Sequence, residues 1–262
     1  MKGVKVSLIM LSVFAVSQLL GLFVNAYYLD TEELPLGMQH SDFEKEQPVL
    51  AVFTFILIAT AALLIIIRLG LWKVWKAWFF IAMTVTVAVF LSVFLEGWTA
   101  LLVAGILSFI RIYEEDDYFS NLMNVLMFSA IGALFAPIFS VFTIIVFMVV
   151  ISAYDFVSVF MTKHIVSIAR ASGEQKGLFP GLVVKWKGES LVLGGGDVAL
   201  PLIFQGVVLS SSGMVPAFLS VYGAVLGLAL LLFLGKKKKF YPAMPFITAG
   251  LLVSYWLSKG LA

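Results

Sequence analysis

The chain of 262 residues contains no cysteine, so it can form neither a disulfide framework nor a thiolate site. Charged residues are also scarce, at 12% of the chain, whereas 62% of the residues are hydrophobic and the mean hydropathy is +1.08. A water-soluble domain of this length carries about a quarter charged residues. The sequence therefore predicts an all-α integral membrane protein, because helices satisfy their own backbone hydrogen bonds in lipid.

Histidine is almost absent as well, and the two histidines, His40 and His164, fall in predicted loops. The chain has no His-Glu-x-x-His motif for a zinc enzyme. The serines at 210–212 lack an intramembrane histidine that could activate them, so we interpret them as part of a turn. We expect neither a metal site nor another cofactor.

Long apolar runs are what the sequence does contain, and a membrane span needs about 20 such residues. The fourth run is short, which leaves open eight spans or a re-entrant segment there. Pro137 is expected to interrupt the helix between the fifth and sixth runs. Nine spans are predicted, near residues 4–26, 49–69, 77–95, 97–110, 120–136, 138–162, 191–210, 214–234 and 242–258.

The basic residues are distributed unevenly between the two sides of this arrangement. Fifteen of the seventeen Lys and Arg residues fall on one side, and only Lys45 and Lys259 fall on the other. Because positive residues are retained in the cytoplasm, the N-terminus is predicted to be cytoplasmic and the C-terminus to lie outside the cell membrane.

A polar, glycine-containing segment at 163–190 divides the chain and is predicted to be a flexible cytoplasmic loop. It separates an N-terminal block of six helices at 1–162 from a C-terminal block of three helices at 191–262. This is a six-plus-three arrangement.

Two of the fifteen carboxylates, Asp155 and Asp197, fall well inside apolar runs. An ionised Asp in hydrocarbon costs roughly 2.5 to 3.5 kcal/mol or more, so such residues usually serve a function. Each Asp is expected roughly 10 Å from the cytoplasmic ends of the sixth and seventh spans, at a rise of 1.5 Å per residue. Adjacent antiparallel helices would therefore bring the two carboxyls level.

Two facing carboxyls in a low-dielectric pocket cannot both ionise, and they titrate as a coupled pair. One can take a proton from a water while the other polarises a peptide carbonyl, as in aspartic proteases. The sequence does not assign the two roles.

Two local features accompany the carboxylates. Gly194, Gly195 and Gly196 precede Asp197 directly, and small residues in a membrane helix usually serve close packing. Their contact with an intramembrane Asp favours a functional role instead. Pro242 opens the last span on the cytoplasmic side, where a proline is also common at an ordinary helix start.

Taken together, these residues resemble the motifs of the presenilin and signal peptide peptidase family. Tyr154-Asp155 resembles its YD motif, Gly194 to Asp197 its GxGD motif, and Pro242-Ala243-Met244 its PAL motif, with Met at the third position instead of Leu. The three motifs occur in the expected order on the expected spans. The motif resemblance covers the sixth to ninth spans, and the predicted orientation resembles the presenilin-like members, in particular compact archaeal ones.

The resemblance implies a presenilin-like, nine-span aspartyl protease that cuts transmembrane helices of other proteins. Asp155 and Asp197 would be its catalytic pair. The expected partners are transmembrane protein or peptide substrates and the lipid bilayer, with no nucleic acid, and a homo-oligomer stays an open alternative. The same resemblance implies substrate-binding roles for Tyr154, Gly194, Gly195, Gly196, Pro242, Ala243 and Met244.

A helical substrate must be unwound before water can attack it, and the freed backbone groups then need partners within the membrane. We expect the segment before the seventh span and the break at Pro242 to supply those partners, with the substrate added as a strand.

Two other readings of the paired carboxylates stay open. A proton- or cation-coupled transporter also requires acidic residues beside broken helices, although no inverted repeat is evident. A non-enzymatic scaffold could use the two Asp side chains to hold helices together, but this reading does not explain their shared depth or the three motifs.

Overall fold

The computed structural model describes residues 2–29, 31, 33–34, 38–39, 54, 58, 69–114, 116–159, 179–235 and 241–261. This part of the chain is mostly helical. Its α-helices are α1 Lys2–Leu29, α3 Trp72–Leu91, α4 Gly97–Tyr113, α5 Asp117–Phe135, α6 Val141–Val157, α8 Gly195–Ser212, α9 Met214–Leu234 and α10 Met244–Leu261.

The structure also contains strands, so the prediction of a purely helical protein is wrong in this respect. Two short strands, β1 Glu33–Leu34 and β2 Met38–Gln39, pair in an antiparallel manner. Two longer strands, β3 Gly181–Trp186 and β4 Glu189–Gly194, form a second antiparallel hairpin.

Most predicted spans correspond to helices, and the predicted eighth span has the same bounds as α9. The span predicted at 49–69 lies almost entirely outside the described residues. The described part of the chain holds eight α-helices, and the count of nine is not confirmed. Within the same part, four helices are long and apolar enough to cross a membrane, while α4 and α6 are apolar but shorter.

Helix boundaries follow local signals that the sequence contains. Pro137 lies in the short 3-10 helix Ala136–Ile138 between α5 and α6, as its missing N–H predicts. Ser140 caps α6 by accepting a hydrogen bond from the backbone N–H of Thr143. Gly213 separates α8 from α9 with a φ of 89°, a conformation that glycine adopts without strain.

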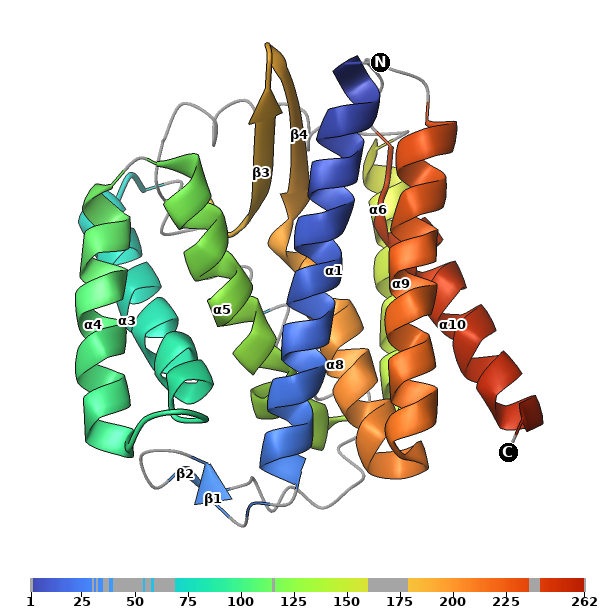
Figure 1. Cartoon of the computed structure of the whole chain (residues 1–262), viewed down its shortest axis with the longest axis horizontal. Helices are drawn as coiled ribbons and strands as arrows, with labels where there is room; N and C mark the ends of the chain where they lie inside the picture. Colours follow the sequence, from blue (N-terminus) through green and yellow to red (C-terminus); the bar gives the residue numbers. More distant parts are fainter. Residues whose placement is uncertain are drawn as a thin grey trace.

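Helix α1 lies centrally in the bundle and contacts α5, α8, α9 and both strands of the longer hairpin (Figure 1). Helices α3 and α4 pack together on one flank, against α5. Helices α6, α9 and α10 lie on the other flank, where α10 contacts α6, α8 and α9. The N-terminus and the C-terminus lie at opposite ends of the molecule.

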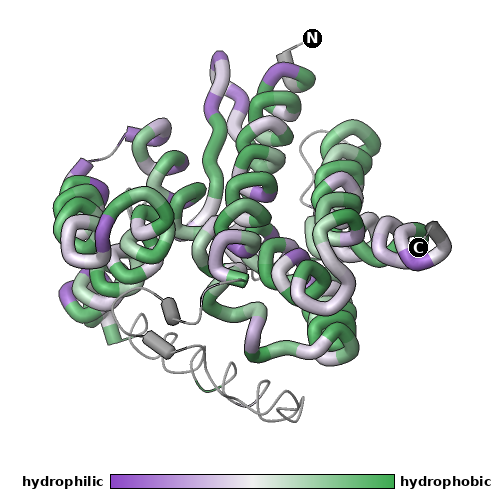
Figure 2. The backbone as a smooth tube through the Cα atoms, turned by 60° about the horizontal axis from the view of Figure 1, so that its bottom comes forward, coloured by the Kyte–Doolittle hydropathy of each residue, from purple (hydrophilic) through white to green (hydrophobic). Residues whose placement is uncertain are grey.

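The helices of the bundle consist largely of hydrophobic residues, as the hydropathy colouring of the backbone shows (Figure 2). On α4 the exposed side chains include Leu102, Ile106 and Phe109, while Ala100 and Ala104 are buried. Soluble proteins rarely expose such continuous apolar patches. The surface therefore suits lipid, which agrees with an integral membrane protein.

The longer hairpin, β3–β4, spans residues for which the sequence predicted other structures. Residues 181–190, expected in a flexible loop, form β3 and the start of β4, and 191–194, expected in the seventh span, complete β4. Lys187 and Gly188 connect the strands with φ angles of 48° and 85°, which are typical of a tight type I′ hairpin turn. Leu182, Val184 and Leu193 are buried in the main core.

Candidate active site

Asp155 lies near the end of α6, and its side chain reaches the start of α10. The backbone N–H of Met244 donates a hydrogen bond to Asp155 Oδ2 at 3.2 Å. The first N–H groups of a helix have no partner within the helix, and the helix dipole places partial positive charge there. The N-terminus of α10 therefore stabilises a negative charge on Asp155.

The sequence around Pro242 explains this arrangement. Proline has no N–H group and favours helix starts, and α10 begins two residues after it, at Met244. Pro242, Ala243 and Met244 are all buried, so the start of α10 is held firmly against the bundle. A hydrogen bond from Ser152 Oγ to Thr248 Oγ1, of 2.8 Å, joins α6 to α10 one turn further into the bundle.

Asp197 lies in the first turn of α8, where the dipole of its own helix also favours negative charge. Its carboxyl interacts electrostatically with that of Asp155 and hydrogen-bonds with the backbone of Gly194. Helices α6 and α8 are in contact. The structure therefore brings together the two carboxylates that the sequence singled out.

The helix bounds around the pair differ from the expected spans. Asp197 is the third residue of α8, because 191–194 belong to a strand and the helix begins only at Gly195. Asp155 lies two residues before the end of α6 at Val157. Asp197 therefore lies at the N-terminal end of α8, and Asp155, near the C-terminal end of α6, accepts an N–H from the start of α10.

The three glycines lie at the junction of β4 and α8, where Gly194 ends the strand and Gly195 and Gly196 open the helix, so only two of them lie in a helix as expected. A Cβ atom on Gly195 would lie 2.5 Å from the carbonyl oxygen of Pro180, so only glycine fits there. A Cβ atom on Gly194 would lie 3.2 Å from Asp197 Oδ2, whereas one on Gly196 would meet nothing within 4 Å. The glycines thus allow close backbone approach at Gly195 and leave open space at Gly196.

Tyr154, the partner of Asp155 in its motif, has a largely exposed side chain, with 67% of its surface accessible. The structure therefore directs this side chain away from the buried interface that Met244 occupies.

Sequence reasoning missed the polar residues that hold α8 in place. Gln18 Nε2 donates to the carbonyl oxygen of Val198 at 3.2 Å, and Gln205 Nε2 donates to Gln18 Oε1 at 2.9 Å. Asn25 Nδ2 donates to the carbonyl oxygen of Leu202 at 3.3 Å. Uncharged polar residues within apolar runs were the available signal, since they often hydrogen-bond between membrane helices.

Among the described residues, no group of three or more His, Cys, Asp or Glu side chains is placed to hold a metal ion. The chemistry available at the site is that of two interacting carboxyls at helix ends. With the apolar bundle around it, this site defines a helical membrane protein of the aspartyl protease class.

A family model agrees with this class. Residues 11–184 match the model described as signal-peptide peptidase, presenilin aspartyl protease. This match covers most of the chain, and the protein belongs to that family. It is an intramembrane aspartyl protease, and such an enzyme acts on transmembrane segments in the bilayer. The matched range includes Asp155 but ends before Asp197 and Pro242.

Two solved structures, each described as a presenilin family intramembrane aspartate protease, resemble the whole chain. One has a TM-score of 0.68 at 17% identity and covers 97% of both chains. The other has a TM-score of 0.69 at 19% identity and covers 95% of this chain and 97% of that chain. At these identities the likeness shows a shared fold. No curated protein matches the chain, and no finding supports the transporter reading.

Proposed function

We propose that Asp155 and Asp197 are the catalytic pair of this protease. The hydrogen bond from the Met244 N–H to Asp155, beside the carboxyl of Asp197, is the observation that carries the proposal. This contact brings all three motifs together. Asp155 belongs to the YD motif, Asp197 to the GxGD motif and Met244 to the PAL-like motif.

In the proposed mechanism, a water molecule lies between the two carboxyls. The ionised Asp takes a proton from this water, and the oxygen attacks the scissile carbonyl while the protonated Asp donates a hydrogen bond to the carbonyl oxygen. The proton then passes to the leaving amine. The two roles stay unassigned, because Asp155 accepts an N–H from the start of α10 and Asp197 lies in the first turn of α8, so a helix dipole favours the charged form of each.

The proposed substrate site lies along the strand that leads to Asp197. Backbone groups at the outer edge of β4 can pair with an unwound substrate segment as an added strand. At the break before α10, the N–H of Met244 is already bonded to Asp155, so β4 supplies the principal edge. The open space at Gly196 and the buried Pro242 and Ala243 would complete the pocket.

The proposed location is the cell membrane, with a cytoplasmic N-terminus. Fifteen of seventeen basic residues fall on the predicted cytoplasmic side, and the tip of the β3–β4 hairpin, with Lys185 and Lys187, lies at the same end of the molecule as the N-terminus (Figure 1).

We propose a division into a block at 1–162 that carries Asp155 and a block at 191–262 that carries Asp197. We propose no nucleic-acid partner, and the mass of the purified enzyme decides whether it is a homo-oligomer.

Cleavage of a peptide with a single transmembrane span, reconstituted in liposomes, tests the catalytic assignment. Wild type should cleave within the span, whereas Asp155→Asn and Asp197→Asn should each lose detectable cleavage. Asp117→Asn is the matched control, because Asp117 lies on the surface in an ion pair with Lys185. Product masses identify the cleaved bond. Cleavage that survives in either Asp155→Asn or Asp197→Asn would disprove the dyad.

A further inference from the structure

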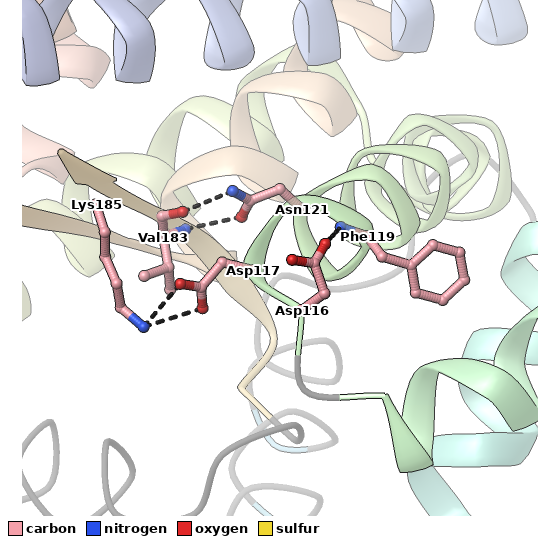
Figure 3. Close-up of polar contacts among 6 residues, drawn as sticks. All are labelled: Asp116, Asp117, Phe119, Asn121, Val183 and Lys185. Carbon is pink, nitrogen blue, oxygen red and sulfur yellow. Dashed lines mark hydrogen bonds and ion pairs between the residues drawn. The ribbon is translucent and has the colours of Figure 1, made fainter.

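Asn121 of α5 hydrogen-bonds to β3 as a neighbouring strand would. Its Nδ2 donates to the carbonyl oxygen of Val183 at 2.6 Å, and its Oδ1 accepts from the N–H of Val183 at 2.9 Å (Figure 3). One side chain thus satisfies both backbone groups of a strand residue. A buried or covered strand edge requires such partners, because unpaired backbone groups are costly away from water.

The same face of α5 contacts β3 at two further points. Asn124 Nδ2 donates to the carbonyl oxygen of Gly181 at 2.6 Å, and Asp117 forms an ion pair with Lys185 at 2.8 Å. From Asp117 to Asn121 the helix rises about 6 Å, and from Lys185 to Val183 the strand advances about 6.7 Å. The helix and the strand therefore match in spacing and run antiparallel.

These contacts determine which backbone groups of the hairpin point outward. In an antiparallel pair, residues alternate between those that bond to each other and those whose N–H and C=O groups face away. Val183 bonds to Asn121, so it faces away from β4, and its register partner Val192 faces the opposite outer edge. The same alternation turns Ser190 and Gly194 outward on β4.

The hairpin therefore has two unlike edges. Among the described residues, the β3 edge is covered by α5 at Gly181 and Val183. On β4, Val192 is 57% exposed, and the strand leads directly to Asp197 three residues after its end. A substrate strand can add to β4 but not to β3. The position of the substrate strand along β4 then depends on how firmly α5 holds β3.

We propose that Asn121 and Asn124 are positioning residues that fix the register in which substrate is presented to Asp197. This inference rests on the proposed docking of substrate to β4. Neither asparagine needs to touch the substrate. They act by preventing the hairpin from sliding along α5 and by closing the alternative edge.

The test measures cleavage of the single-span reporter by the full chain carrying Asn121→Leu, whose side chain has the same number of heavy atoms and the same branching but no hydrogen-bonding group. Asn121→Ser, which is polar but too short for both bonds, is a second variant in case the first does not fold. We expect KM to rise about twofold to tenfold per lost hydrogen bond, with a smaller change in kcat, and product masses to spread to neighbouring bonds. Tyr118→Phe on the same helix is the control, because its side chain is 78% exposed, and it should retain the wild-type bond and KM.

The possible outcomes distinguish the positioning role of the asparagines from the proposed catalytic function. An unchanged KM and unchanged product masses in a folded Asn121 variant would overturn the positioning role, while the catalytic proposal would stand. A general loss of stability with the same cleaved bond would also overturn it, because it indicates a purely structural role. If Asp155→Asn or Asp197→Asn still cleaves, the proposed function fails instead, whatever the asparagine variants do.

Discussion

The backbone N–H of Met244 is the smallest structural feature on which the proposed chemistry depends. It connects the start of α10 to the carboxylate of Asp155 at 3.2 Å. A backbone donor keeps its position when the side chain changes, which explains how Met can stand where the family motif has Leu. The side chain itself is buried, with 2% of its surface exposed.

Met244→Pro should reduce kcat/KM by about tenfold to a hundredfold, because proline removes this donor, and hydrogen bonds to charged groups contribute roughly 1.5 to 3 kcal/mol. Proline is tolerated in the first turn of a helix, so the fold should survive. Met244→Leu is the matched control and should retain near wild-type activity. Reporter cleavage gives kcat/KM, and circular dichroism checks the helix content. Full activity in Met244→Pro would show that the bond has no catalytic importance.

At the scale of elements, α9 and α10 approach so closely that glycine is required where they meet. A Cβ atom on Gly250 would collide with the backbone of Gly223, and one on Gly227 would collide with the carbonyl oxygen of Phe246. Small residues allow such approach between membrane helices, where packing replaces the hydrophobic effect. Because α10 also carries Met244, this contact helps to position the site.

Gly250→Leu should destabilise the protein by about 1 to 3 kcal/mol or more, since the added side chain forces the two helices apart. Gly260→Leu on the same helix is the control, because a Cβ atom there meets nothing within 4 Å. Thermal unfolding in detergent should show a lower Tm for the first variant and a wild-type Tm for the second. Equal Tm values for the two variants would contradict the close packing.

At the scale of the whole molecule, the positions of the termini and of the basic residues support the proposed orientation in the membrane. The N-terminus and the hairpin tip lie at one end of the bundle, and the C-terminus lies at the other (Figure 1). The helices between these ends consist largely of hydrophobic residues (Figure 2). Such helices suit a bilayer, where the transmembrane substrates of an intramembrane protease also lie.

Because the chain has no cysteine, single cysteines can report this orientation. In right-side-out vesicles, a membrane-impermeant thiol reagent should label Lys259→Cys near the C-terminus but not Lys185→Cys on the hairpin. Both positions should react after the vesicles are lysed. The reverse pattern in intact vesicles would place the N-terminus outside.

The membrane class, most helix positions and the acidic pair could be predicted from local features. The range 214–234 is a continuous apolar run ended by glycines, and its predicted bounds coincide with those of α9. Asp155 and Asp197 were recognisable because carboxylates are rare inside apolar runs. The catalytic roles of these two residues stay predictions, as do the roles of the glycines and of Pro242.

The hairpin could not be predicted in the same way. Leu191-Val192-Leu193 is a short apolar run, and this pattern is equally consistent with a strand and with the start of a membrane helix. This run forms a strand because it pairs with β3, and β3 is in turn held by hydrogen bonds from Asn121 and Asn124 to Val183 and Gly181, about sixty residues later in the chain.

The sequence by itself thus determined that this chain is a membrane-embedded helical protein with two interior carboxylates, because hydrophobicity and buried charge are properties of single segments. Only the tertiary structure decided that α8 begins at Gly195, that β4 leads to Asp197, and that α10 directs its first N–H group at Asp155. Those features depend on contacts between segments far apart in the chain, which local composition does not encode.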